Sequence, residues 1–120
     1  MLTEEGKYRL SETFDRISQM PGPNILDTTK DGQDLEIWYQ GHWVQEHSCG
    51  TSACFAGWYC IFWLNIHENS SYAMDLMGAD VFGTSVDNLT LEEYEILEKL
   101  VHSRNSLSDI RTILNELGVH

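Results

Sequence analysis

An apolar run in the middle of the chain, Ala53 to Leu64, restricts the possible folds more than any other feature of the sequence. Its twelve residues are too few to cross a membrane, which takes about 20. A helix made from this run would be apolar on nearly all sides, so other elements must surround it. We therefore predict a buried central helix over residues 51–66, capped by Thr51 or Ser52.

Four further helices are predicted from hydrophobic spacing and from start and stop signals. The first spans residues 3–20 and ends before a Pro-Gly-Pro sequence, because proline cannot continue a helix. A short one spans residues 71–78, where Gly78 is a natural stop. The last two begin with capping boxes, at Thr90-Leu91-Glu92-Glu93 and at Ser106-Leu107-Ser108-Asp109.

The helix that starts after Thr90 divides clearly into an apolar and an acidic side. Its predicted solvent-exposed face carries Glu92, Glu95 and Glu98. Its predicted buried stripe consists of Leu91, Tyr94, Leu97, Leu100 and Val101.

The segment over residues 24–48 is compatible with two structures. Asp31-Gly32 is a turn signal, and alternating apolar residues follow it as in a half-buried strand. The segment forms either a small β-hairpin, at about residues 25–40, or a surface loop anchored by aromatic side chains. The whole chain is expected to be a single domain, residues 1–120, since its length bounds it to one domain. We expect it to be mainly α-helical, with about five helices packed around the central helix.

The charge of the chain is concentrated in its middle. The sequence has 19 acidic residues against 7 basic ones, for a net charge of −12. No Lys or Arg lies between Lys30 and Lys99, a stretch that holds twelve acidic residues. Such a surface argues against direct binding of nucleic acid and against docking on anionic lipid. It favours a basic protein as the partner.

The first residues and the cysteines indicate the compartment. The sequence MLTEEGKYRL is charged and lacks the apolar segment of a signal peptide. Three cysteines, Cys49, Cys54 and Cys60, are an odd number, which does not suggest a disulfide scaffold. We expect reduced thiols and a cytoplasmic location.

The most distinctive motif is Cys49-Gly50-Thr51-Ser52-Ala53-Cys54-Phe55-Ala56-Gly57-Trp58. It resembles a CGTxxCxAGW element found in small, mostly uncharacterised proteins of bacteriophages and bacteria. The likeness extends to Ala73-Met74-Asp75-Leu76-Met77-Gly78, which is similar to a helix ending in Leu-Gly in such proteins. The resemblance implies phage or mobile-element biology in the cytoplasm of a bacterial host. It implies no activity.

Two chemical hypotheses concern these cysteines. In the first, the chain is a small cysteine-dependent enzyme that uses Cys49 or Cys54, because a helix N-terminus favours the thiolate, with His47 as a candidate base. In the second, His42, His47, Cys49 and Cys54 hold a structural zinc ion. We favour a third interpretation, in which the thiols pack as small apolar groups and no cofactor is bound.

The surface suggests an interaction protein. The candidate partner-binding residues are acidic ones around the fourth helix and two tryptophans in the irregular region: Glu92, Glu95, Glu98, Asp87, Trp38 and Trp43. The tryptophans either anchor an interface or cover the central helix. We expect a small acidic phage-type protein that binds and inhibits a basic, nucleic-acid-handling host protein, as anti-CRISPR and anti-restriction inhibitors do. The sequence leaves the target and the oligomeric state open.

Overall fold

The computed structural model describes residues 2–20, 35–38, 44–47, 50–67 and 70–119, and this part of the chain is mainly helical with three short strands. The elements in chain order are α1 (Glu4–Ser18), β1 (Leu35–Trp38), β2 (Val44–His47), β3 (Gly50–Ala53), α2 (Phe55–Tyr59), the π-helix η2 (Cys60–Leu64), α3 (Tyr72–Phe82), the 3-10 helix η3 (Val86–Asn88), α4 (Leu91–Val101) and α5 (Leu107–Glu116).

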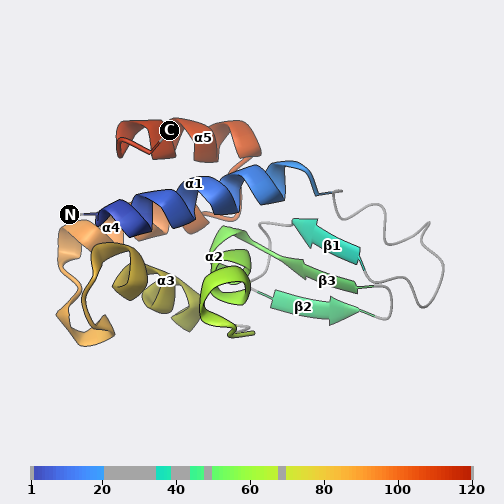
Figure 1. Ribbon diagram of the computed structural model, residues 1–120, viewed down its shortest axis with the longest axis horizontal. Coiled ribbons are helices and arrows are strands. Elements are labelled where there is room, and N and C mark those ends of the chain that lie inside the picture. Colours follow the sequence, from blue (N-terminus) through green and yellow to red (C-terminus); the bar gives the residue numbers. More distant parts are fainter. Residues whose placement is uncertain (1, 21–34, 39–43, 48–49, 68–69, 120) are drawn as a thin grey trace.

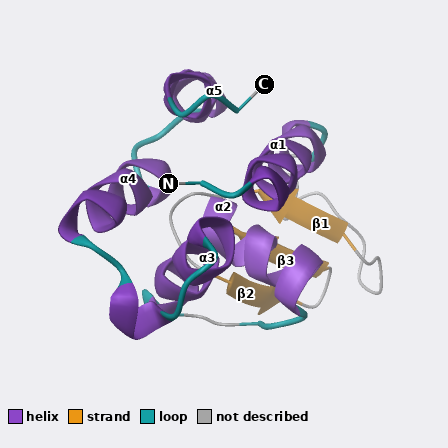
Figure 2. Cartoon of the chain, turned by 60° about the vertical axis from the view of Figure 1, so that its left-hand side comes forward, coloured by secondary structure: helices purple, strands orange, loops and turns teal. Residues whose placement is uncertain are grey.

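The helices gather around α1, and the strands lie at one end of the molecule (Figure 1). Helix α1 contacts α2, α3 and α5, while α4 packs against α3 and α5. The view in Figure 2 shows α1, α3 and α4 side by side, with α5 above α1 and α4. The expectation of a mainly helical fold is confirmed.

The core is built around α2, as the apolar run in the sequence predicts. All five residues of α2 are buried. From α1, Leu10, Phe14 and Ile17 pack into the same core, because spacings of four and three place them on one helix face. Within the described residues, no helix has both the length and the apolar character required to cross a membrane.

The predicted start of the central helix is wrong. Residues 50–53 form β3 instead, which pairs in parallel with β1 and antiparallel with β2. Neither Thr51 nor Ser52 caps the helix, since its N-cap residue is Cys54. Pairing on both sides gives the backbone of β3 hydrogen-bond partners, and this tertiary effect outweighs the local helix signal. The expected helix up to residue 66 is also shortened, because η2 ends at Leu64 and Asn65 adopts a left-handed conformation with φ of 55°.

Only part of the segment over residues 24–48, for which the sequence allows a hairpin or a loop, lies within the described residues. The turn signal Asp31-Gly32 lies outside the described residues. The antiparallel pair that the structure describes is formed by β2 and β3, with Val44 opposite Ala53 and His47 opposite Gly50.

Helix α3 is longer than predicted. It continues past Gly78 to Phe82 and ends at Gly83, which has a φ of 63°. Gly78 is instead a packing residue, because a Cβ atom there would lie 2.3 Å from Cδ1 of Leu97 in α4. The absence of a side chain therefore lets α3 and α4 approach closely.

Both predicted capping boxes are confirmed, but only Leu97 and Leu100 of the predicted buried stripe of α4 are buried, while Tyr94 and Val101 are half-buried and Leu91 is exposed. The Thr90 and Glu93 pair caps α4, and the Ser106 and Asp109 pair caps α5. Leu91 is 83% exposed, whereas Leu97 is buried. Six residues at 3.6 per turn place Leu91 about 120° around the helix from Leu97, at the edge of the buried face.

Candidate functional site

The outward face of α4 carries a row of exposed glutamates. Glu92, Glu95 and Glu98 are all exposed and repeat every three residues. None of them forms an ion pair with another residue in the described part of the chain. We call these three side chains, together with the exposed Leu91, the α4 acidic face.

Asp87 lies close to this face. It is an exposed residue of η3, the short helix that precedes α4. Burial is the main cause that raises the pKa of Tyr94 in α4, and the nearby charges of Asp75 and Asp87 raise it further. The structure thus brings four of the predicted partner-binding residues, Asp87 and the three glutamates, to neighbouring elements.

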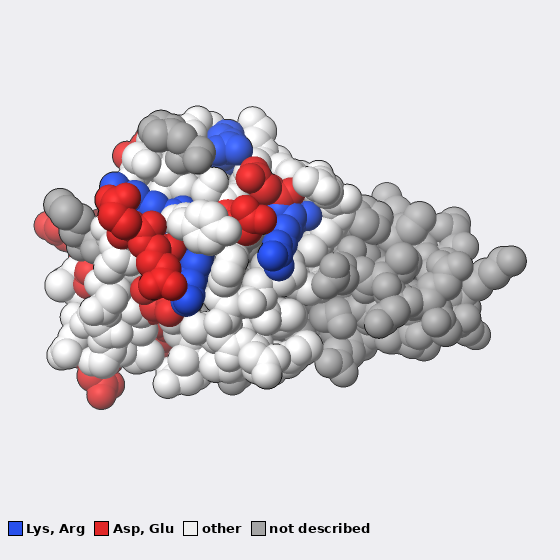
Figure 3. All heavy atoms as spheres, viewed as in Figure 1, with Lys and Arg blue, Asp and Glu red and all other residues white. Residues whose placement is uncertain are grey.

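The acidic residues of α1 are arranged differently from those of α4. Each has a basic partner: Glu4 pairs with Lys7, Glu5 with Arg9, Glu12 with Arg16, and Asp15 with Arg111. On the face shown in Figure 3, acidic and basic side chains accordingly lie next to one another. Glu92, Glu95 and Glu98 of α4 thus differ from the acidic residues of α1, each of which has a basic partner.

A groove lies where α4 meets the ends of three other helices, and it encloses about 480 Å³. We call it the α4–α5 groove. Its lining consists of Leu2, Lys7, Phe82, Glu92, Glu93, Ile96, Glu116 and Leu117. Apolar side chains from four separate elements thus meet charged ones, three of which are carboxylates.

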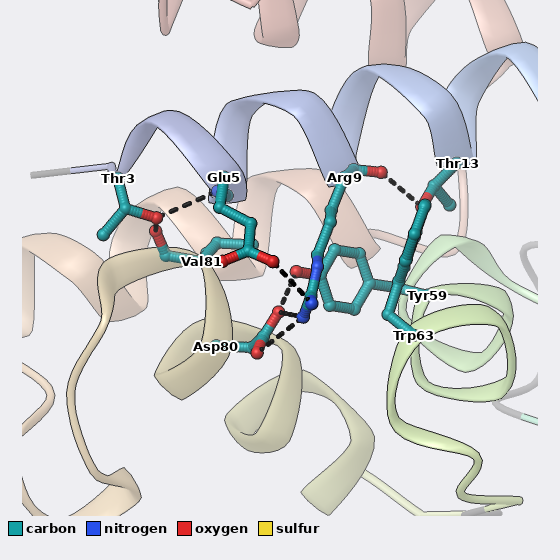
Figure 4. A network of polar contacts seen from close by, with 9 residues as sticks. Thr3, Glu5, Arg9, Thr13, Tyr59, Trp63, Asp80 and Val81 are labelled. Carbon is teal, nitrogen blue, oxygen red and sulfur yellow. Dashed lines mark hydrogen bonds and ion pairs between the residues drawn. The ribbon is translucent and has the colours of Figure 1, made fainter.

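A polar cluster ties α1, α2 and α3 together (Figure 4). Nη1 of Arg9 donates hydrogen bonds to both carboxylate oxygens of Asp80, at 3.0 and 2.8 Å. The Tyr59 hydroxyl donates to the same carboxylate. Nη2 of Arg9 also donates to Glu5, at 2.7 Å. The contact to Asp80 is bifurcated, because one nitrogen donates to both oxygens, and charge-assisted hydrogen bonds of this kind are among the stronger polar interactions in proteins.

The cluster continues along α1 to the π-helix. Nε1 of Trp63 donates to Oγ1 of Thr13 at 3.0 Å, and Thr13 donates to the carbonyl oxygen of Arg9 at 2.7 Å. The guanidinium of Arg9 lies 5.3 Å from the centre of the Trp63 ring. Burial and the Asp80 carboxylate raise the pKa of Tyr59, so its hydroxyl remains a donor. These groups hold one another in place, which indicates a structural role.

The sequence arguments did not identify this cluster, although one signal was present. Arg9 and Thr13 lie four residues apart in α1, beside the buried stripe of Leu10, Phe14 and Ile17. A charged side chain at the margin of an apolar helix face needs a partner. That partner, Asp80, comes from 71 residues away in the chain, and spacing cannot reveal it.

Cys54 does not have the surroundings of a nucleophile. Its side chain is 1% exposed. Burial raises the pKa of the Cys54 thiol to about 11, although the backbone amides of Gly57 and Ala56 act in the opposite direction. The thiol is therefore protonated at neutral pH, and an attacking group must be a thiolate.

The sheet register separates His47 from Cys54. His47 lies opposite Gly50 at one end of β3, and Cys54 follows the other end. Four residues of extended chain span about 13 Å, too far for the two to bind one zinc ion or to act as a base–nucleophile pair. His42 and Cys49 lie outside the described residues, among which no group of three metal-binding side chains occurs.

The side chains of the two tryptophans predicted as interface anchors lie outside the described part of the structure. The backbone of Trp38 ends β1 and pairs with Ala53 of β3, but its side chain is outside the described part. Trp43 is likewise outside it.

Comparison of the chain with protein-family models, with curated proteins and with solved structures finds no match. The function is therefore inferred from the residues themselves.

Proposed function

We propose that this chain is a small acidic interaction protein that binds and inhibits a basic, nucleic-acid-handling protein of a bacterial host. The α4 acidic face carries the proposal. It combines three exposed glutamates without cationic partners among the described residues and one exposed leucine. Complementary charge steers association and selects partners.

The proposed biological role is counter-defence, as with anti-CRISPR or anti-restriction inhibitors. A groove that binds DNA or RNA must be basic, because most of the affinity comes from contacts to phosphate. An exposed row of carboxylates can occupy such a groove in place of phosphates. The phage-like sequence motif at residues 49–58 supports the same role.

The first test is capture of a basic partner at low salt. The immobilised chain is exposed to bacterial extract, and retained proteins are eluted with rising salt and identified by mass spectrometry. We expect a basic nucleic-acid-handling protein to be retained, and the triple variant E92K/E95K/E98K to lose it. If no such protein is retained at low salt, the proposal is wrong.

A matched variant tests whether binding depends on the position of the acidic residues or only on the net charge of the chain. E4K/E12K/D15K changes the net charge by the same amount on α1, where each acid has a basic partner. Exposed ion pairs contribute only about 0–1 kcal/mol each, so both triple variants should fold. Binding should survive in the α1 variant. Equal loss in both variants would mean that only net charge matters.

The counter-defence role is tested in cells. Bacteria that carry a restriction or CRISPR system are infected with a targeted phage, with and without expression of the chain. We expect expression to restore plaque formation and E92K/E95K/E98K to abolish that effect. Unchanged plaque numbers across a panel of such systems would contradict the counter-defence role.

A further inference from the structure

The α4–α5 groove has an apolar floor built from four parts of the chain. Leu2 precedes α1, Phe82 ends α3, Ile96 lies in α4 and Leu117 follows α5. Phe82 is almost buried, and the other three are half-buried. The volume of about 480 Å³ is at the lower end of the range of about 300–1,000 Å³ typical of ligand pockets. It suits inserted side chains more than a whole docked helix.

The wall of this groove is fixed by backbone contacts. The Thr3 amide donates to the carbonyl oxygen of Val81 at 3.0 Å, and the Thr3 hydroxyl contacts the same oxygen at 3.3 Å. The Gly6 amide donates to the Thr3 hydroxyl at 2.9 Å. These bonds hold Leu2 beside Phe82, so the floor is formed before anything binds, which lowers the entropic cost of binding.

The rim of the groove is acidic. Glu92 and Glu116 form no ion pair with other described residues. Glu93 caps α4 by accepting from the Thr90 amide, a bond that lowers the pKa of its carboxyl group and keeps it ionised. Among the described residues of the lining, Lys7 is basic, and its Nζ lies 3.7 Å from the exposed carboxylate of Glu4.

Helix ends of both signs meet at the groove. Helices α3 and α5 end there, and neither has a basic residue in its last turn, while α1 begins just after Leu2 and the first turn of α4 carries Glu92 and Glu93. The partial charges of these helix ends oppose one another, so the negative charge of the groove comes from its carboxylates. A second copy of this chain does not suit these carboxylates, because it brings its own net charge of −12.

We propose that the α4–α5 groove binds a segment of the basic partner protein that presents an apolar side chain flanked by Lys or Arg. The apolar side chain lies on Leu2, Ile96 and Leu117, and the cations contact Glu92 and Glu116. This inference rests on the proposed function and adds to it a partner chemistry. The partner is recognised by an apolar contact as well as by charge.

The test uses three labelled peptides and the intact chain, with binding followed by fluorescence anisotropy. One peptide, GRKLFRKG, carries both features; GRKSSRKG keeps only the charge; GESLFESG keeps only the apolar pair. We expect the first to bind at least about tenfold more tightly than either of the others, since burying one large apolar side chain is worth about that factor or more. Shifts of the methyl signals of Leu2, Ile96 and Leu117 should accompany its binding.

Variants on the chain locate the contact. E92Q/E116Q removes two rim charges, and E12Q/D15N removes two charges from α1 outside the groove. Only the first should weaken binding of GRKLFRKG, by about fivefold to tenfold, while circular dichroism confirms that both variants are folded. An equal effect of the two variants would overturn the groove proposal.

The remaining outcomes separate this inference from the proposed function. If GRKLFRKG and GRKSSRKG bind equally, the acidic surface acts by charge alone, so the groove proposal is wrong and the proposed function stands. If neither binds, the groove proposal is also wrong, and capture of a basic partner decides the proposed function independently.

Discussion

Asp80 is the residue on which three helices depend, because its carboxylate accepts from Arg9 of α1 and from Tyr59 of α2. Asp80→Asn keeps the size of the side chain but leaves the Arg9 guanidinium, which is 23% exposed, with only the exposed carboxylate of Glu5. We expect the free energy of unfolding to fall by about 2 kcal/mol, since a partly buried charge loses its less exposed partner. Urea denaturation measures this change in the free energy of unfolding.

Glu5→Gln is the matched control for this prediction. It removes the other carboxylate bound to the same guanidinium, but Glu5 is largely exposed. Its loss should change the free energy of unfolding by at most about 0.5 kcal/mol. Similar losses in both variants would contradict the role assigned to Asp80.

The buried thiol of Cys54 makes the stability of the folded chain depend on pH in the alkaline range. Burial raises the pKa of its thiol from 9.0 to about 11 in the folded chain. Below pH 9 both states keep the proton, so the thiol has no effect. Above pH 9 the thiol ionises in the unfolded chain before it does so in the folded chain. The free energy of unfolding therefore falls as the pH rises toward 11, by about 3 kcal/mol in total.

Two measurements check this behaviour of Cys54. Urea denaturation from pH 8 to pH 11 should show a shallower loss of stability in Cys54→Ala than in the unchanged chain. Iodoacetamide at neutral pH should modify Cys54 more slowly than it modifies free cysteine. A thiol that reacts faster than free cysteine would restore the hypothesis of an enzyme.

At the scale of elements, two glycines set how closely helices approach. A Cβ atom on Gly6 of α1 would lie 2.4 Å from the backbone oxygen of Val81 and 2.8 Å from its Cα atom. Backbone cannot move aside easily, so Gly6→Ala should destabilise the chain by about 1–3 kcal/mol. This loss should appear despite the gain of about 1 kcal/mol that alanine brings to a helix.

Gly78→Ala is the comparison. Its Cβ atom would meet the end of the Leu97 side chain, which can change its rotamer. The loss in thermal stability should therefore be smaller than for Gly6→Ala. The reverse order would show that the contact of α1 with the end of α3 is loose.

The elements differ in how well the sequence predicts them. Capping boxes at Thr90 and Ser106 are local signals, and both helices begin where those signals place them. Residues 51–53 fall within the predicted central helix, but in the structure they belong to β3, which pairs with two other strands. One of these strands, β1, is separated from β3 in the sequence by β2, so no local pattern shows their parallel pairing.

At the scale of the whole molecule, the charge pattern was predictable along the chain but not in space. The sequence shows that no Lys or Arg occurs between Lys30 and Lys99. It does not show that the acids of α1 have basic partners, whereas Glu92, Glu95 and Glu98 of α4 form no ion pair with other described residues. The α4–α5 groove escapes prediction for the same reason, because its floor joins positions as distant as Leu2 and Leu117.

The hydrogen bonds from Thr3 to Val81 have a consequence for the order in which the molecule assembles. They join positions 78 residues apart, and closing so long a loop costs entropy before the contact can stabilise anything. Helices α1 and α3 can each form earlier from local contacts. By this argument the junction between them forms after the helices themselves, and the floor of the groove beside it is complete only once α1 and α3 have met.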